Sequence, residues 1–297
     1  MTDTKTFKGT NIQEKSPLSY KIAKHQNLKW LILLIPLLFV VLTMVVSMVS
    51  ILGKSFIDND GFTLEYYKKI LTEPLYLKVL FNTLKVGFIV TVVTLLLAYP
   101  TAYLSVRAKQ KWVRSLITGG VLIPYWISML VRIFAWQILL QTNGVVNQIL
   151  VGLGITKEPV QILYTTTAVV ISLTHILMPY MFLSLQSNME GIDGNLSRAS
   201  EGMGAKPVRN FLDIFLPLSV PGIASGSLMV FVLSLGFYIA PALLGGADNM
   251  MMSNLIETDM NNFNSNLAAA LSFELLIIVF IIIGVAFKFL GNIFVKK

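Results

Sequence analysis

Long runs of apolar residues dominate the chain and set its predicted architecture. A helix rises about 1.5 Å per residue, so about 20 apolar residues cross the hydrocarbon core of a bilayer. The runs are apolar on every side, unlike the in-out alternation of barrel strands of about ten residues. The sequence therefore predicts an all-α membrane protein with six transmembrane helices, over residues 31–52, 86–106, 116–140, 164–187, 218–244 and 268–287.

The ends of these runs divide the chain into parts. We expect residues 1–28 to form a cytoplasmic polar tail and residues 29–53 to form the first transmembrane helix. That first run is longer than the apolar part of a signal peptide, and no small-residue cleavage site follows it, so we expect it to be retained. A membrane core over residues 75–290 and a short cytoplasmic tail over residues 291–297 complete the division.

Composition and charge fit a membrane protein. Only 13% of the residues are charged, 55% are hydrophobic, and the net charge is +8. Lys and Arg concentrate in the N-terminal tail, in residues 107–114, in residues 188–217 and at the C-terminus, whereas most acidic residues lie in the other loops. Because basic residues mark cytoplasmic loops, this asymmetry predicts that both termini are cytoplasmic. The positive charge thus indicates topology, and we expect no nucleic-acid partner.

The polar segment between the fourth and fifth runs, residues 188–217 (called loop 188–217 below), is patterned as two short helices. Ser197 or Asn195 is suited to cap the first helix, and Gly204 to end it in a left-handed conformation. Three residues of this helix share one apolar face: Leu196, Ala199 and Met203.

The second helix of loop 188–217 is expected to begin at Pro207 and to end at Pro217. Arg209 and Asp213 are spaced to pair across one turn on its polar face. Its apolar stripe holds Val208, Phe211, Leu212 and Phe215. Two such helices on a membrane surface suit either a docking site for a soluble partner or a plain interfacial connector, and the pattern alone leaves both open.

The stretch ASEGMGAKPVRNFLDIFLPLSVPGI, residues 199–223, resembles the EAA loop of type I ABC importer permeases. In that family a short E-A-A element and a glycine precede a helix that ends in a hydrophobic-Leu-Pro run. The resemblance implies a permease bundle whose loop acts as a coupling helix in a cleft of a separate ATPase. The coupling residues that it implies are Arg198, Ala199, Ser200, Glu201, Gly204, Ala205, Lys206, Arg209 and Asp213.

One position departs from the family pattern. The family's glutamate lies six residues before the glycine, where this chain has Arg198, and Glu201 lies three positions further on. The resemblance therefore implies that any salt bridge made by that glutamate is inverted or shifted here.

Residues 122–150 and 237–260 are similar to polyamine-type permeases, and the likeness extends over residues 75–290. It is nearest to the first permease of spermidine/putrescine importers. It implies a bacterial inner-membrane location, a second permease subunit, an extracytoplasmic substrate-binding protein and an ABC ATPase dimer that uses Mg-ATP, with no cofactor on this chain. Relatives of the group carry iron, thiamine, opines or phosphonates, so these substrates stay as alternatives.

A few residues inside the apolar runs are candidates for the pathway. A charge in the membrane is costly and usually faces a bundle interior or a cavity. Arg132 and Glu274 are such charges, and the two could pair with each other; His175 fits a core histidine or a ligand. Pro241 can break its helix and free carbonyl groups beside Tyr238.

Three acidic residues of the predicted outer loops, Asp248, Glu257 and Asp259, are candidates for contact with a polyamine or a binding protein, or are simply solvated charges. The chain has no cysteine and two histidines, and it lacks the Walker loop, HExxH and GxSxG motifs, so we expect neither an enzyme nor a metal site. An ion-coupled carrier would need carboxylates in both halves, and only Glu274 is available. A membrane scaffold is the remaining alternative.

Overall fold

The computed structural model describes residues 17–58 and 61–295, and the side chains of residues 34–58, 61–247 and 249–288. The chain forms two units, Met1–Gly53 and Lys54–Lys297. The first unit contains most of helix α1 (Pro17–Phe56), so residues 17–28 of the predicted tail are helical, while residues 1–16 lie outside the described part. The apolar window of α1, within Leu34–Phe56, buries none of its residues, as expected of a helix surrounded by lipid.

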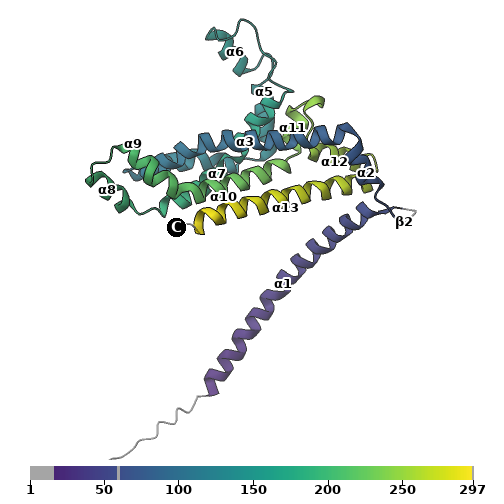
Figure 1. The fold of residues 1–297 in the computed structure, drawn as a ribbon, viewed down its shortest axis with the longest axis horizontal. Helices are drawn as coiled ribbons and strands as arrows, with labels where there is room; N and C mark the ends of the chain where they lie inside the picture. Colours follow the sequence, from purple (N-terminus) through teal and green to yellow (C-terminus); the bar gives the residue numbers. More distant parts are fainter. Residues whose placement is uncertain (1–16, 59–60, 296–297) are drawn as a thin grey trace, which may run out of the picture. The chain divides into compact units, whose positions relative to one another are not determined.

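The second unit is built on four long helices: α3 (Pro74–Arg107), α7 (Thr166–Glu190), α10 (Leu216–Leu235) and α13 (Ser265–Val295). Helices α3, α7 and α10 pack on one another and run side by side in Figure 1. Val90, Phe182 and Val230, one from each of these helices, are fully buried in their shared core.

Glycines let the helices of this core approach closely. A Cβ atom added to Gly222 of α10 would lie 2.7 Å from the Cβ of Asn188 in α7, and one added to Gly226 would lie 2.7 Å from the sulfur of Met181. Lipid is as apolar as the side chains, so helix association in a membrane depends on such close packing rather than on the hydrophobic effect.

The third apolar run is not one straight helix, which corrects the prediction for residues 116–140. It consists of α4 (Lys111–Leu122), the 3-10 helix η1 (Ile123–Trp126) and α5 (Met129–Leu139), with a bend of 100° between the first two together and α5. Pro124 supplies no N–H to the helix, and the backbone of Ile127 and Ser128 is extended. Five of the described helices are long and apolar enough to cross a membrane, or six if the bent pair is one span.

The fifth run also differs from its prediction at both ends. The second helix of loop 188–217 does not stop at Pro217: α9 (Pro207–Asn210) leads through the π-helix η2 (Phe211–Phe215) directly into α10. Pro217 has no N–H to donate to the helix. The wider π-helical turn before it lets the helix continue although that hydrogen bond is missing. At its other end α10 stops at Leu235, and α11 (Ile239–Leu244) follows as a separate helix.

Short elements occupy the two ends of the bundle. Helix α8 (Gly194–Gly202) and α9 lie at one end, while α2 (Glu65–Thr72) and α12 (Met252–Asn261) pack with α13 and α3 toward the other (Figure 1). Strands β1 (Ile57–Asp58) and β2 (Gly61–Phe62) pair in an antiparallel hairpin. The remaining elements are α6 (Val145–Gly152), beyond α5, and the 3-10 helix η3 (Ala247–Asn249).

Candidate functional site

Helix α8 in loop 188–217 has a defined cap at each end. Its N-cap is Asp193, whose carboxylate accepts a 2.9 Å hydrogen bond from the amide of Asn195, so the prediction of a Ser197 or Asn195 cap was wrong. At the other end Gly204 has a φ of +87°, which confirms the predicted left-handed glycine.

The turn at Gly204 is closed by two backbone hydrogen bonds. The amide of Gly204 donates to the carbonyl of Glu201 at 2.9 Å, and that of Ala205 donates to the carbonyl of Ser200 at 3.1 Å. This paired pattern is the Schellman motif, which satisfies the last carbonyls of a helix and favours glycine at the left-handed position. The turn therefore sets the angle at which α8 meets α9.

A buried polar network joins α8 to α9. Ser197 and Asn210 are each 5% exposed. The amide nitrogen of Asn210 donates to the Ser197 hydroxyl at 2.8 Å and to the Glu201 carboxylate at 3.1 Å, and its oxygen accepts from the Ser197 hydroxyl at 3.1 Å. Arg107, the last residue of α3, donates to the same hydroxyl at 2.9 Å.

Aromatic rings pack against the Arg107 side chain of this network. The Arg107 guanidinium lies 5.1 Å from the ring centre of Phe215 and 5.8 Å from that of Tyr103. Tyr103 in turn packs edge-to-face on Phe211 and Phe215, at 5.4 and 4.9 Å between ring centres. Cation–aromatic and edge-to-face contacts of this kind hold the C-terminal end of α3 against η2.

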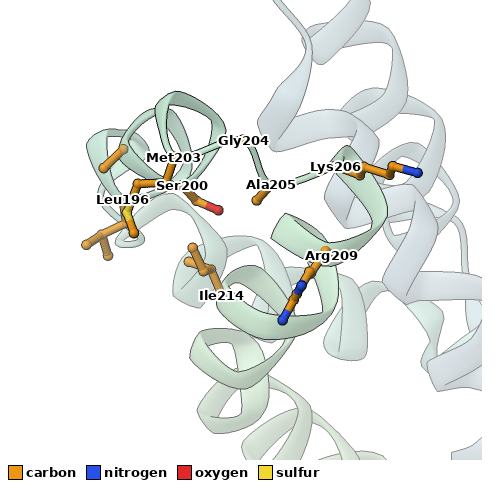
Figure 2. Close-up of a pocket in the computed structure, with 9 residues that line it drawn as sticks. Leu196, Ser200, Met203, Gly204, Ala205, Lys206, Arg209 and Ile214 are labelled. Carbon is orange, nitrogen blue, oxygen red and sulfur yellow. The ribbon is translucent and has the colours of Figure 1, made fainter.

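The surface of loop 188–217 presents apolar side chains around a hollow of about 830 Å³. Met203, which lines the hollow, is 88% exposed, and Val208, which lies on the loop outside it, is 70% exposed. Figure 2 shows Leu196 and Met203 of α8 on one side of the hollow and Ile214 on the other. The residues that line the hollow are Leu196, Ala199, Ser200, Met203, Gly204, Ala205, Lys206, Arg209 and Ile214. Exposed apolar groups collected in one place are typical of a surface that a partner covers.

Loop 188–217 carries three basic and four acidic residues, and some of these charges are paired or hydrogen-bonded. Arg209 pairs with Asp213 at 3.1 Å, as predicted from their spacing, and Glu201 is held by Asn210. Arg198 and Lys206 are exposed, and neither takes part in an ion pair within the described residues. Arg198 therefore offers a positive charge at the position where the family pattern has a glutamate.

Arg132 of α5 lies among aromatic side chains. It is only 9% exposed, and its Nε and Nη1 atoms have no hydrogen-bond partner among the described residues. Tyr125 and Tyr180 lie within electrostatic range of its guanidinium and pack edge-to-face on each other at 5.7 Å. The predicted pairing of Arg132 with Glu274 is not present in the described part of the structure: Glu274, on α13, has a buried carboxylate oxygen that also lacks a partner.

His175 of α7 belongs to the same neighbourhood as Arg132. Its Nδ1 accepts a 3.2 Å hydrogen bond from the indole of Trp136, one turn along α5 from Arg132. The hydrogen of a neutral His175 is therefore on Nε2. Tyr238 is 44% exposed at the start of α11, and Pro241 is buried inside that helix, which packs against α5 and α7.

The three acidic candidates of the predicted outer loops have different environments. The side chain of Asp248 lies outside the described part of the structure. Glu257 is exposed and accepts a hydrogen bond of 2.6 Å from Asn261. Asp259 is 9% exposed, and its burial raises the pKa of its carboxyl group, an effect that Asn264 and Lys69 oppose. A buried carboxyl group is a poor first contact for a soluble ligand, so Glu257 is the more accessible of the two.

The sequence reasoning missed the residues that hold loop 188–217 in place. Arg107 was counted only as a charge that indicates topology, and Ser197 only as a cap. Asn210 lies outside the apolar stripe that was predicted for this helix, and its role depends on contacts across 13 residues that no local pattern predicts.

Comparison with known proteins identifies the family. Residues 94–297 match the family described as "Binding-protein-dependent transport system inner membrane component". The chain belongs to this family. That membership confirms the resemblance carried by residues 199–223 and the predicted inner-membrane location, and EAA loops of the kind seen here are part of the family.

Several curated relatives of this family member are permease proteins. The spermidine/putrescine transport system permease protein PotB of Escherichia coli (strain K12) is 35% identical over 237 residues, which cover 77% of this chain and 86% of the relative. PotB of Haemophilus influenzae (strain ATCC 51907 / DSM 11121 / KW20 / Rd) is 32% identical over 246 residues, covering 80% and 85%. The inner membrane ABC transporter permease protein YdcU of E. coli (strain K12) is 28% identical over 278 residues, covering 87% and 88%.

Solved structures share the fold. A chain of the bacterial alginate ABC transporter, in complex with alginate pentasaccharide-bound periplasmic protein, superposes with a TM-score of 0.70 at 18% identity, covering 90% of this chain and 95% of that one. A chain of the MetNI methionine ABC transporter in an inward facing conformation gives 0.58 at 17% identity, covering 74% and 96%. These likenesses confirm the predicted all-α permease bundle.

Proposed function

We propose that this chain is the membrane permease subunit of an ATP-driven ABC importer and forms part of the pathway for a polyamine. The observation that carries the proposal is the geometry of loop 188–217: two short helices set by a glycine turn, with exposed apolar side chains and the exposed basic residues Arg198 and Lys206. Membership of the family and the 35% identity to a spermidine/putrescine permease support the same function.

Loop 188–217 is suited to receive force from a soluble ATPase. Its exposed Met203 and Val208 can enter a cleft of the partner, while Arg198 and Lys206 favour acidic groups in that cleft. Its second helix is continuous with α10 through η2, so a displacement of the loop passes directly into a helix of the core. This chain binds no nucleotide in the proposal, and the partner ATPase supplies Mg-ATP hydrolysis.

The direction of transport follows from the proposed topology. With loop 188–217 in the cytoplasm, the ends of the bundle that carry α2 and α12 face outward, where a binding protein would deliver substrate. A second permease subunit, similar or identical, would enclose the pathway with this one. ATP binding and hydrolysis would then shift the assembly between outward-open and inward-open states, because nucleotide binds the two states with different affinity.

The buried polar and aromatic groups of the bundle include some that favour a cationic polyamine and one, Arg132, that opposes it. An ammonium group can be stabilised by the Glu274 carboxylate oxygen that has no partner among the described residues, and by the aromatic rings of Tyr125 and Tyr180. The positive charge of Arg132 would repel the ammonium group. In the proposal Arg132, which lies near Tyr125 and Tyr180, is therefore an electrostatic barrier to the polyamine and not one of its ligands. The same guanidinium would be the leading ligand if the substrate were an anion.

Substrate competition in a reconstituted importer tests the proposal. The chain would be assembled with its partner permease, ATPase and binding protein in liposomes, and uptake of labelled spermidine and putrescine would be measured against unlabelled thiamine, ferric iron, a phosphonate and an opine. We expect inhibition by polyamines alone. No ATP-dependent uptake of labelled spermidine or putrescine, together with uptake of labelled thiamine or phosphonate by the same liposomes, would overturn the polyamine assignment while leaving the importer in place.

A further inference from the structure

Helix α3 does not adjoin loop 188–217 along the chain. The loop follows α7 along the chain and leads into α10 through η2, so these two helices receive any displacement of the loop through the backbone. Helix α3 nevertheless packs against both of them and supplies the core with Val90 and Ala98. If α7 and α10 moved without α3, this shared core would have to shear.

The hydrogen bond between α3 and α8 is made through the hydroxyl group of Ser197. The Ser197 hydroxyl accepts from Arg107 Nη2 at 2.9 Å and from Asn210 Nδ2 at 2.8 Å, and it donates to Asn210 Oδ1 at 3.1 Å. A hydroxyl has one hydrogen and two acceptor lone pairs, so all its capacity is used. A buried network with every member satisfied is rigid, and loss of one member leaves the others unpaired.

Arg107 is held on its other side as well. Its guanidinium stacks over Phe215, at the end of the π-helix η2, and over Tyr103, one turn back along α3. Single π turns inside helices are frequent at functional sites, because they widen the helix and expose a carbonyl or re-aim a side chain. Here the π turn places Phe211 and Phe215 in contact with Tyr103 of α3, the helix that also supplies Arg107 to the polar network.

We propose that Arg107, Ser197 and Asn210 form a latch that makes α3 move with the loop, so that α3, α7 and α10 respond to the ATPase as one body. These are positioning residues, since they touch neither substrate nor nucleotide. The proposal rests on the proposed function, because it assigns a path for the motion that an ATPase would impose.

Matched substitutions separate the latch from general effects on the protein. Arg107→Lys keeps the positive charge but loses the fork that reaches Ser197 while stacking on Phe215. Arg114→Lys is the control: Arg114 pairs with Glu190 of α7 on the same side of the bundle and makes no contact with α8 or α9 among the described hydrogen bonds. Ser197→Ala removes the shared hydroxyl, and Ser197→Thr restores it.

The assay is the number of substrate molecules transported per ATP hydrolysed by the reconstituted importer. Arg107→Lys and Ser197→Ala should keep ATP hydrolysis and assembly with the ATPase, while transport per ATP falls about tenfold to a hundredfold, as expected for loss of one hydrogen bond to a charged group. Arg114→Lys and Ser197→Thr should keep the wild-type ratio. An unchanged ratio in Arg107→Lys and Ser197→Ala would overturn the latch.

A second measurement reports the movement of α3 itself. The chain has no cysteine, so Lys109→Cys places a single thiol just beyond α3 for labelling with a maleimide. We expect its labelling rate to change on addition of ATP and vanadate in the otherwise wild-type complex, and to stay constant when Arg107→Lys is added. An equal change in both proteins would contradict the latch even if transport were impaired. Absence of ATP-dependent uptake by the wild-type complex would instead overturn the proposed function.

Discussion

The turn at Gly204 gives the sharpest prediction for loop 188–217. Its φ of +87° lies in the left-handed region, and a Cβ atom added there would meet nothing within 4 Å. Gly204→Ala therefore introduces backbone strain without a clash. An L-residue in the left-handed region costs about 1–2 kcal/mol. If docking needs this conformation, the substitution should weaken ATPase binding by about five- to thirtyfold.

Two further variants isolate the backbone effect. A Cβ atom at Gly202, in the last turn of α8, also meets nothing within 4 Å, but Gly202 has no positive φ. Gly202→Ala should leave affinity unchanged or slightly improved, because alanine favours a helix over glycine. Gly204→Asn should fall between wild type and Gly204→Ala, since asparagine tolerates the left-handed region.

The assay is the dissociation constant of the purified permease complex for its ATPase, measured at fixed salt, together with the uptake rate. The order of affinity should be Gly202→Ala at least equal to wild type, then Gly204→Asn, then Gly204→Ala. Equal affinities for Gly202→Ala and Gly204→Ala would refute the reasoning that the Schellman turn presents the docking surface.

Other predictions concern charge, pH and topology. Arg198→Glu should weaken ATPase binding at low salt more than at high salt, because the exposed charge of Arg198 favours acidic groups in the cleft; equal weakening at all salt concentrations would count against this. Burial raises the pKa of Asp259, so its ionisation destabilises the fold as pH rises from about 4 through the folded pKa. Asp259→Asn should therefore raise the melting temperature more at pH 8 than at pH 4, and a pH-independent difference would contradict that cause. In inner-membrane vesicles of known orientation, a membrane-impermeant maleimide should reach Asn195→Cys from the cytoplasmic side and Asn262→Cys from the opposite side; the reverse result would invert the predicted topology.

The long apolar runs predicted the bundle well because lipid imposes one simple rule. Every backbone group inside the membrane must be paired, so a run of about 20 apolar residues becomes a helix whatever its neighbours are. The interruptions were harder to place. The bend after Pro124 and the break between α10 and α11 depend on how the helices pack, and Pro221 and Pro179 sit inside continuous helices with no such break.

Loop 188–217 was predictable where the signal was local. Gly204 ends α8, Pro207 begins α9, and Arg209 pairs with Asp213, all as their spacing indicated. The link from Arg107 to Ser197 joins residues 90 positions apart, and no periodicity reveals it. The sequence reasoning missed that the helix continues past Pro217, because a proline usually marks a helix end. Here a π turn precedes the proline and the helix continues.

The central claim is that this chain moves substrate with energy supplied by a separate ATPase. The most direct measurement is uptake of labelled spermidine into liposomes that contain the full importer, with ATP present or absent and with an active or a hydrolysis-deficient ATPase subunit. The account predicts uptake only with ATP and the active ATPase. Uptake by this chain without the ATPase, driven by an ion gradient, would contradict it.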